Sequence, residues 1–364
     1  MSARTATSTA DLAAHYAHHP LGLETATVAV LMGGRSSERE VSLASGRMVL
    51  DALRTSEATD DRRGPGRVIA VEILPDGRWR HGKNVSMPGE AIVALADVDV
   101  FFSALHGGEG ENGALQGFLT CSDMPFTGSG VIASAVAMDK VFARELVRAS
   151  GVTVARGVAL SRSLWPMGEA QAREVELLLA GGCVVKPRRG GSSVGCSLVH
   201  ARAEFERAVE RAFEEGPEVL AEAFVAGVET TGGVLEAPDG TLLALPPVEI
   251  RPRGTFFDYH EKYDADGALE LCPPVGIVPE DCARIEARAL AAHRALGCEG
   301  YSRTDFIVPE GGGEPVYLET NTLPGLTPRS LLPKAAGALG IDYRTLCLWI
   351  AKSGLARAPA RRNG

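Results

Sequence analysis

The stretch from Tyr301 to Asn321 constrains the fold more than any other part of this chain. Two runs rich in β-forming residues, YSRTDFIV and EPVYLETN, flank PEGGG, and this pattern predicts two adjacent strands joined by a hairpin loop. Side chains of a strand alternate between its faces, so Glu319 and Asn321 share one face. By the same rule Arg303 lies beside Asp305 and adds a positive charge. Pairing of the strands would bring three oxygen donors together, as Mg²⁺ prefers when it is shared with nucleotide phosphates. The alternative is a sheet with an ordinary charged, solvent-facing side.

The composition limits the kinds of partner. With 364 residues the chain is long enough for two or three domains. Lys+Arg number 37 against 46 Asp+Glu, and aromatic residues are 5%, so we expect no nucleic-acid partner. The seven cysteines form no C-x-x-C pair, which predicts reduced thiols in a cytoplasmic protein without a zinc site. We expect no membrane segment, because no apolar run reaches the roughly 18 residues that span a bilayer. Residues 1–26 lack an apolar signal segment and predict a loose tail.

Strand–loop–helix units recur in the first third of the chain. TVAVLMGG predicts a buried strand, and the helix after it would begin with a capping box formed by Ser37 and Glu40. VDVFFSALHGG predicts a second buried strand before a short helix. Such units in series favour an α/β domain with an open, mainly parallel sheet, whose ligands gather at the carboxyl ends of strands. Glu38 and His106 follow two such ends, although His106 could equally form a structural hydrogen bond that caps its loop.

The middle of the chain indicates a phosphate site without a P-loop motif. G-x-x-x-x-G-K-[ST] is absent, but Lys186 ends the buried strand CVVKP, where an unpaired ammonium would be costly. RRGGSSVG follows, and its glycines leave backbone N–H groups open to phosphate oxygens. Lys140, on a helix predicted from 134 to 149, and Lys262 are further candidate cations, although most lysines are solvated surface charges. Cys196 has no positioned histidine beside it, which favours a packing role.

Two acids frame an apolar edge in EAFVAGVE, which runs from Glu222 to Glu229. This pattern suits a hinge strand that meets adenine and ribose, but a solvated strand edge explains it equally well. Residues 255–274 show little periodicity and predict a long functional loop.

Seven motifs in one order make the chain similar to a known family. They are GGRSSEREVSLASG, ALHGGEGENGALQG, FTGSGVIASAVAMDK, VVKPRRGGSSVG, FFDYHEKY, RTDF and ETNTLPGLTPRSL. The chain resembles D-alanine–D-alanine ligases, which have the ATP-grasp fold, from about residue 27 to 352. The resemblance implies three domains, 27–130, 131–226 and 227–356, between tails of residues 1–26 and 357–364.

The resemblance also implies the reaction. ATP phosphorylates the carboxylate of one D-alanine, the amine of a second D-alanine attacks the acyl phosphate, and a tetrahedral intermediate expels phosphate. Two Mg²⁺ or Mn²⁺ ions would serve each active site, and the product would enter peptidoglycan precursor synthesis. Family members are usually cytoplasmic homodimers.

Roles carry over residue by residue from the family motifs. Catalytic roles fall on Glu38, Ser192, Tyr263, Arg303 and Gly325. Substrate contacts fall on Glu38, His106, Arg303, Ser330 and Leu331. ATP contacts fall on Lys140, Lys186, Ser192, Ser193, Glu222, Phe224, Val225, Glu229 and Lys262. The metal ligands implied by the resemblance are Asp305, Glu319 and Asn321. Arg303 and the Gly325 N–H match the family's oxyanion stabilisers.

Three positions depart from the usual family pattern. The family usually shows GEDG where Asn112 follows Glu111, a single glycine where Gly190 precedes another, and a small residue at Glu261. The tyrosine in HEKY favours an amine as the nucleophile over a hydroxyl. The alternatives left open are a ligase of the same fold with D-serine, D-lactate or another D-amino acid as second substrate, a non-catalytic nucleotide-binding regulator, and a carboxylating ATP-grasp subunit.

Overall fold

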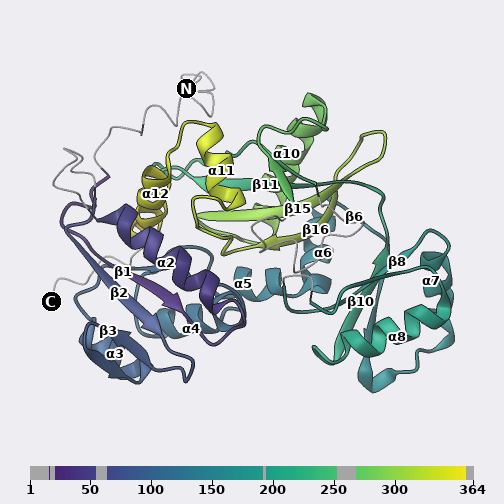
Figure 1. Ribbon diagram of the computed structural model, residues 1–364, viewed down its shortest axis with the longest axis horizontal. Coiled ribbons are helices and arrows are strands. Elements are labelled where there is room, and N and C mark those ends of the chain that lie inside the picture. Colours follow the sequence, from purple (N-terminus) through teal and green to yellow (C-terminus); the bar gives the residue numbers. More distant parts are fainter. Residues whose placement is uncertain (1–15, 17–20, 55–63, 192–193, 252–267, 358–364) are drawn as a thin grey trace.

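Three β-sheets built from successive stretches of the chain lie side by side (Figure 1). The computed structural model describes Tyr16 and residues 21–54, 64–191, 194–251 and 268–357. The α/β class predicted from the strand–loop–helix units is confirmed.

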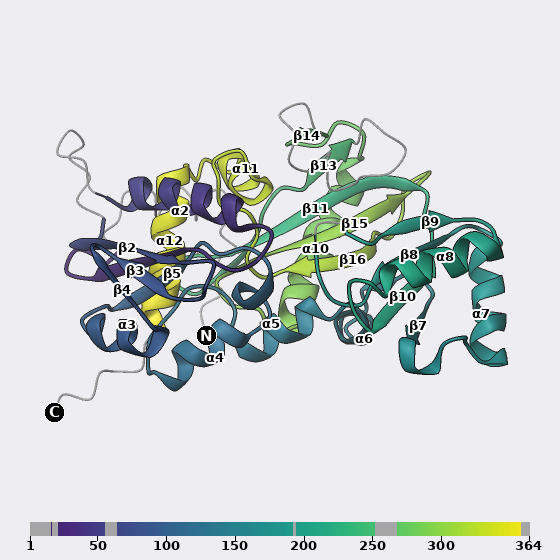
Figure 2. The same ribbon diagram turned by 60° about the horizontal axis from the view of Figure 1, so that its bottom comes forward.

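The first sheet is open and has five strands in the order β4-β3-β2-β1-β5. Its parallel strands are β1 (Thr27–Gly33), β2 (Arg67–Ile73) and β5 (Val100–Ser103). An antiparallel hairpin of β3 (Trp79–His81) and β4 (Asn84–Ser86), which the motifs did not predict, extends it. Helix α2 (Arg39–Leu53) packs on one face, and α3 (Pro88–Ala94) and α4 (Ala114–Cys121) pack on the other (Figure 2). Alternation in β1 explains the two cores, because Val28 and Val30 face α2 whereas Ala29 and Leu31 face α3 and α4.

The predicted capping box at the start of α2 is wrong. The helix begins at Arg39 with Glu38 in the N-cap position, and no side chain caps it. Ser36 Oγ accepts a hydrogen bond from the Glu38 N–H at 3.3 Å and donates one to the His106 carbonyl at 2.6 Å. These bonds tie the loop after β1 to the loop after β5.

The predicted loose tail is wrong for residues 21–26. Leu21, Leu23 and Ala26 are buried in the core that also holds β1 and α2. Farther back, the Tyr16 ring meets the Trp349 ring edge-on at 6.0 Å. The packed part of the chain therefore starts earlier than its composition indicated.

The second sheet is antiparallel and has the order β7-β10-β8-β9. Its strands are β7 (Gly157–Ser161), β8 (Cys183–Pro187), β9 (Ser197–Val199) and β10 (Glu218–Ala223). Helices α7 (Glu169–Leu179) and α8 (Arg202–Ala212) form a separate core with it, into which Cys183 and Val185 point. Because strand side chains alternate, Val184 and Lys186 lie on the opposite face, away from these helices.

The third sheet has the order β14-β13-β11-β15-β16-β6, and β12 also pairs with β11. Its strands are β6 (Thr153–Val154), β11 (Gly227–Glu236), β12 (Leu242–Ala244), β13 (Val248–Arg251), β14 (Leu269–Leu271), β15 (Tyr301–Pro309) and β16 (Val316–Asn321). The predicted hairpin is confirmed as β15 and β16, in which Asp305 pairs with Glu319 and Arg303 with Asn321. Helix α10 (Pro279–Ala295) packs against β11 and β15.

Helices α11 (Leu331–Ala338) and α12 (Tyr343–Ala356) join the third sheet to the first in one core. Trp349 of α12 is fully buried there. The second sheet has its own core and does not share the core of the other two sheets. Its boundary with the third sheet is therefore not filled by a common core, and a cavity can form there.

The helix predicted from 134 to 149 is two helices. They are α5 (Val131–Met138) and α6 (Lys140–Ala149), and the chain is extended between them at Asp139. The Asp139 carboxylate accepts hydrogen bonds from the Val141 and Phe142 N–H groups, as a favoured N-cap residue does. Helix α6 runs below β16, between the first and second sheets (Figures 1 and 2).

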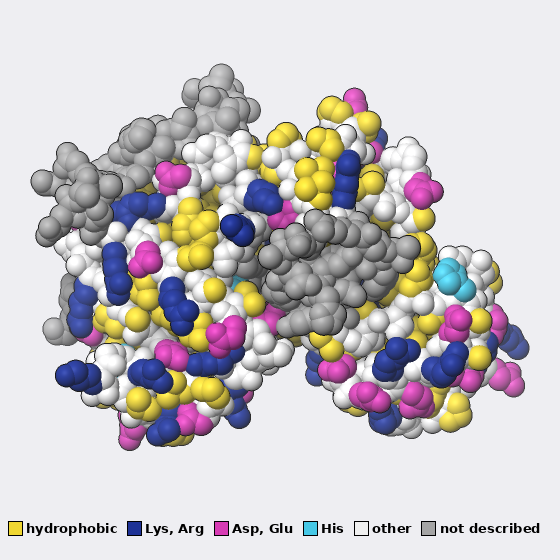
Figure 3. Space-filling model, in the orientation of Figure 1, with side chains coloured by type: hydrophobic (Ala, Val, Ile, Leu, Met, Phe, Trp, Pro, Cys, Tyr) yellow, Lys and Arg dark blue, Asp and Glu magenta, His cyan; other side chains and the backbone are white. Residues whose placement is uncertain are grey.

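Basic and acidic side chains are interspersed on the face that Figure 3 shows, including the surface over α7 and α8. Within the part of the chain that the structure describes, every helix is too short or too polar to cross a membrane.

Candidate active site

A cavity of about 590 Å³ lies where the second sheet meets the third. This volume is typical of a small-molecule site. Its lining includes eight of the residues predicted to contact nucleotide or metal: Lys140, Lys186, Glu222, Phe224, Val225, Glu229, Asp305 and Glu319. Gly190 and Gly191 also line it, and they add exposed backbone to the charged side chains.

Lys186 forms a buried ion pair with Glu222. The two residues lie on the adjacent strands β8 and β10, their charged atoms are 2.5 Å apart, and each side chain is 9% exposed. Burial alone would lower the pKa of the Lys186 ammonium, but the neighbouring Glu222 carboxylate outweighs it and the pKa is raised. Arg144 of α6 lies 3.5 Å from the other Glu222 oxygen. The cavity wall thus carries a permanent cation, and its partner is an acid that faces the same space.

Lys140 brings a second cation to the cavity. It is the first residue of α6, and its Nζ donates a hydrogen bond to the Gly190 carbonyl at 2.5 Å. The same Nζ lies 3.5 Å from Glu319 Oε2 on β16. Lys140 therefore connects the glycine loop to the carboxylates of the third sheet.

Arg303 and Asp305 form a bidentate pair along β15. Arg303 Nε and Nη2 donate to Asp305 Oδ1 and Oδ2 at 2.9 and 2.8 Å, and the side chains are 11% and 8% exposed. Asp305 and the guanidinium lie on one face of the strand, as the sequence predicts. On β16, Asn321 Oδ1 accepts a hydrogen bond from the Leu323 N–H at 2.9 Å, which turns the chain out of the strand.

His106 and Glu111 form a buried polar cluster behind Arg303. His106 Nε2 is hydrogen-bonded to Ser45 Oγ at 3.0 Å, and Nδ1 to the Leu323 carbonyl at 3.3 Å. Burial lowers the pKa of His106, so the ring is neutral at neutral pH. Burial also raises the pKa of Glu111, to about 8, and the nearby Glu38 adds to the rise whereas Arg303 opposes it. The charges of Glu38 and Arg303 therefore act on both His106 and Glu111.

Glu38 lies next to this cluster, because its carboxylate approaches the backbone of Gly107, the residue after His106. Gly107 has a φ of 68°, and a Cβ built there would lie 2.4 Å from Glu38 Oε2. Only a glycine allows the carboxylate to approach the backbone so closely. The structural alternative for His106 is correct in that both ring nitrogens form hydrogen bonds, but the partners lie on α2 and after β16 and not in its own loop. His106 also lies among the predicted substrate residues.

The predicted clamp for the second substrate lies in the loop from β16 to α11. Ser330 occupies the N-cap position of α11, and its Oγ accepts a hydrogen bond from the Thr327 N–H at 3.1 Å. A Cβ on Gly325 would lie 2.8 Å from the same oxygen. Gly325, Ser330 and Leu331 therefore gather in one tight turn, outside the lining of the large cavity.

The chain matches two family models over most of its length. One, described as D-ala D-ala ligase N-terminus, matches residues 27–92 and 83–129, and the other, D-ala D-ala ligase C-terminus, matches residues 146–351. The chain belongs to the D-Ala–D-Ala ligase family. A D-alanine–D-alanine ligase of Geobacter sulfurreducens is 42% identical over 316 residues, which cover 86% of this chain and 89% of the relative.

Solved structures of the family share the fold. The VanG D-Ala:D-Ser ligase of Enterococcus faecalis is 30% identical, with a TM-score of 0.76 over 90% of this chain and 98% of its own. The D-alanine–D-alanine ligase of Bacillus anthracis complexed with ATP is 29% identical, with a TM-score of 0.72 over 91% of this chain and 98% of its own. The predicted ATP-grasp fold is therefore confirmed.

Four predicted site residues and one departure from the family pattern lie outside the described residues. They are Ser192, Ser193, Lys262, Tyr263 and Glu261.

Some residues at the site had no signal in the sequence. Arg144, Arg189 and Arg251 are examples: Arg189 and Arg251 line the cavity, and Arg144 pairs with Glu222. Spacing does not reveal which way a loop or helix arginine points. Asp139, by contrast, could have been found, because an aspartate before an amphipathic helix is a favoured N-cap.

The donor set on β15 and β16 fits a magnesium ion shared with phosphates. Asp305 and Glu319 offer hard carboxylate oxygens on paired strands, and Asn321 offers an amide oxygen. Asp305 accepts from Arg303, but a carboxylate has about four acceptor positions, so capacity remains. Among the described residues no group of three or more His, Cys, Asp or Glu side chains is arranged to hold a metal ion.

Replacing Glu111 with glutamine should flatten the pH dependence of the melting temperature. The folded carboxyl has a pKa of about 8 against an ordinary 4.5, so between these values the folded state holds more protons. Stability then falls as the pH rises through this window. Glu111→Gln cannot titrate, and we expect it to be more stable than the unaltered protein at about pH 8, with a smaller difference at about pH 5.

Thermal unfolding without nucleotide or divalent metal measures this effect. Glu109→Gln is the matched control, because Glu109 is two residues away and its side chain is 60% exposed. A difference between Glu111→Gln and the unaltered protein that is the same at both pH values would contradict the raised pKa.

Proposed function

We propose that this protein uses ATP to join two D-alanines into D-alanyl-D-alanine through an acyl-phosphate intermediate. The observation that carries the proposal is the continuity of the site. The cavity with Lys140 and Lys186 ends at Asp305, which is paired with Arg303, and Arg303 acts electrostatically on the cluster of His106 and Glu111. A phosphate donor and a small zwitterion can thus meet at Arg303.

The cavity would hold ATP. Lys140 and Lys186 would neutralise the phosphates, and Glu222, Phe224, Val225 and Glu229 would contact adenine and ribose. The relative complexed with ATP supports this assignment. Asp305, Glu319 and Asn321 would hold Mg²⁺ or Mn²⁺, two ions per active site, which would neutralise phosphate charge.

The chemistry would proceed in two steps around Arg303. The first D-alanine carboxylate attacks the γ-phosphorus of ATP, and ADP leaves. The amine of the second D-alanine then attacks the acyl carbon, the C–N bond forms, and the C–O bond breaks to release phosphate. Arg303 and the Gly325 N–H would stabilise the oxyanion between these events.

The two amino acids would be held on opposite sides of Arg303. Glu38 would bind the ammonium of the first D-alanine beside the neutral His106 ring. Ser330 and Leu331 would bind the carboxylate of the second. Ser192 and Tyr263 would connect Glu38 to the glycine loop and the long loop, as the family motifs imply.

The proposal extends to the setting of the reaction. It includes a cytoplasmic homodimer that supplies peptidoglycan precursors and has neither a nucleic-acid nor a membrane partner. It also includes three domains, 27–130, 131–226 and 227–356. Within the middle one, β6 pairs with β16, so this strand belongs to the third sheet.

A second candidate is the same chemistry with D-serine as the second substrate. The similarity to the VanG D-Ala:D-Ser ligase, with a TM-score of 0.76, favours keeping it. Glu38, Lys186 and Arg303 would have the same roles in both reactions. The loop around Ser330, which would bind the second substrate, would therefore determine whether D-alanine or D-serine is used.

Phosphate release from ATP with D-alanine alone tests the proposal, and the products are identified by mass. Turnover with D-alanyl-D-alanine as product is the expected result, with no turnover when Mg²⁺ is omitted. Turnover only after addition of D-serine or D-lactate would support the second candidate. No turnover with any pair would contradict both, and light scattering on the same sample tests the dimer.

A further inference from the structure

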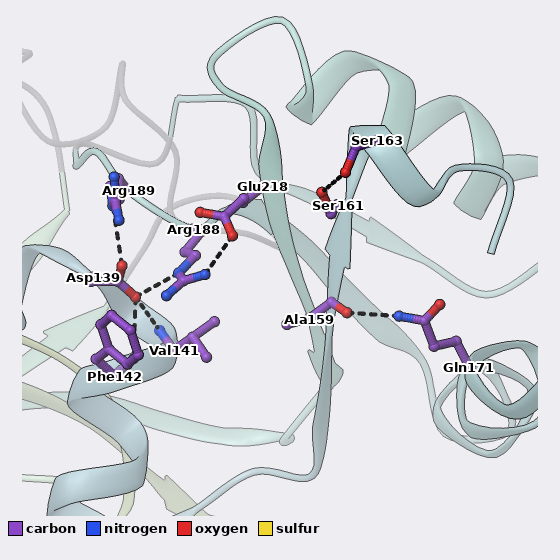
Figure 4. A network of polar contacts seen from close by, with 10 residues as sticks. All are labelled: Asp139, Val141, Phe142, Ala159, Ser161, Ser163, Gln171, Arg188, Arg189 and Glu218. Atoms are coloured by element: carbon purple, nitrogen blue, oxygen red, sulfur yellow. Dashed lines mark hydrogen bonds and ion pairs between the residues drawn. The ribbon is translucent and has the colours of Figure 1, made fainter. Parts of the chain in front are cut away.

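Asp139 is a buried carboxylate that joins two parts of the chain. It lies between α5 and α6 with 1% of its surface exposed. Oδ1 accepts hydrogen bonds from Val141 and Phe142 N–H groups at 3.2 Å and from Arg188 Nε at 2.7 Å (Figure 4). Oδ2 accepts from Arg189 Nε at 3.1 Å. One carboxylate therefore holds the start of a helix and two consecutive arginines of the loop after β8.

Arg188 carries this connection to the second sheet. Its Nη1 donates to Glu218 Oε1 at 2.6 Å, and its guanidinium lies 4.7 Å from the centre of the Phe142 ring (Figure 4). Its backbone carbonyl accepts from the Lys140 N–H at 3.0 Å. Arg188 is outside the cavity lining, whereas Lys140 and Gly190 are part of it.

Charge keeps this arrangement in place. Burial alone would raise the pKa of Asp139, but the Arg188 and Arg189 guanidiniums and the helix N–H groups outweigh it, and the pKa is lowered. The carboxylate is ionised at neutral pH, so its bonds to both arginines are charge-assisted. Arg188, with its side chain 13% exposed, has few waters to replace a lost partner.

We propose that Asp139 is a positioning residue for the phosphate-binding half of the cavity. Through Arg188 and Arg189 it fixes the glycine loop against the start of α6, so that Lys140 Nζ stays at the Gly190 carbonyl and near Glu319. The inference rests on the proposed function, in which this cavity takes ATP. It assigns to Asp139 no contact with the nucleotide, because Asp139 lies outside the cavity lining.

Asp139→Asn should weaken ATP binding and leave adenosine binding unchanged. The amide keeps the size and one acceptor oxygen but loses the charge that holds both arginines. We expect the Kd of ATP to rise roughly tenfold, which corresponds to about 1.4 kcal/mol. Adenosine has no phosphates and meets the Glu222 side of the cavity, so its Kd should change less than about twofold. Calorimetric titration of both ligands measures the split, and KM for ATP should rise while KM for D-alanine does not.

Two further variants separate positioning from stability. Asp281→Asn is the matched control, since Asp281 is equally buried, pairs with Arg284 near the start of α10, and lies outside the cavity. It should lower the melting temperature without changing either Kd. Arg188→Gln should reproduce the selective loss of ATP binding, and it replaces Asp139→Asn if that variant does not fold.

The outcomes are distinguishable. If folded Asp139→Asn and Arg188→Gln bound ATP as tightly as the unaltered protein does, the positioning role of Asp139 would be overturned. A parallel loss of ATP and adenosine, or a selective loss in Asp281→Asn as well, would overturn it too. An unaltered protein that does not bind ATP would overturn the proposed function first, before any variant is compared.

Discussion

Replacing Arg303 with alanine should lower kcat by roughly 10²–10³-fold, the usual effect of removing one oxyanion donor. The guanidinium is buried, and although burial opposes its charge, Asp305 outweighs burial and raises its pKa, so it is charged at every working pH. Arg303 interacts with both parts of the proposed site, because it pairs with Asp305 of the cavity lining and acts electrostatically on His106. The variant should still bind ATP through Lys140 and Lys186 but should lack the charge that stabilises the transition state. The effect should therefore be a lower kcat. Steady-state phosphate release measures it.

The control for Arg303→Ala must deal with stability, because Asp305 would be left buried without its partner. Arg284→Ala removes the partner of the buried Asp281 outside the cavity lining, and it should lower the melting temperature but not kcat. Arg303→Lys keeps the charge but loses the bidentate geometry of the guanidinium. Its kcat should therefore lie between that of Arg303→Ala and that of the unaltered protein. Turnover near that of the unaltered protein in folded Arg303→Ala would remove the arginine from the mechanism.

Sequence reasoning predicted the parts of the site that lie on regular strands. Glu319 and Asn321 are two residues apart in a β-rich run, and a glycine-rich loop returns the chain, so both the hairpin and the shared face follow from local geometry. A β-bulge between Asp305 and Phe306 shifts the register so that Asp305 lies opposite Glu319, and the sequence pattern does not predict this bulge. Glu38 and His106 were found by a second general rule, that ligands collect where parallel strands end.

The errors lie where the outcome depends on tertiary packing. Residues 134–149 are continuous in helical propensity, and although an aspartate is a favoured N-cap, the two arginines that pair with Asp139 lie about fifty positions away. Leu21 and Leu23 lie in a polar, small-residue segment, but the first core has room for them. Glu111 reads as a polar loop residue, and only the three-dimensional fold shows that it is buried beside Glu38.

Lys186→Met should weaken ATP binding and destabilise the fold at the same time. A charge-assisted contact contributes about 1.5–3 kcal/mol, so the Kd of ATP should rise roughly 10- to 100-fold. Among the described residues, Glu222 would keep Arg144, 3.5 Å away, as its counter-charge. Breaking a buried ion pair costs about 3–5 kcal/mol. Because Arg144 still offsets part of the Glu222 charge, we expect the free energy of unfolding to fall by about 3 kcal/mol. Denaturant unfolding and calorimetric titration measure the two effects separately.

The double variant Lys186→Met/Glu222→Gln separates these effects, because it removes both charges of the pair. Replacing both partners of a buried pair is often nearly neutral, so the free energy of unfolding should recover while ATP binding stays weak. Lys334→Met, which removes a partly exposed ion pair with Glu270 outside the cavity, should change neither quantity by much. If the double variant regained both stability and ATP affinity, Lys186 would have only a structural role, with Glu222 as its counter-ion. If it regained stability alone and bound adenosine no more weakly than Glu222→Gln does, the buried ammonium would be a phosphate ligand that Glu222 keeps charged and in place until ATP binds.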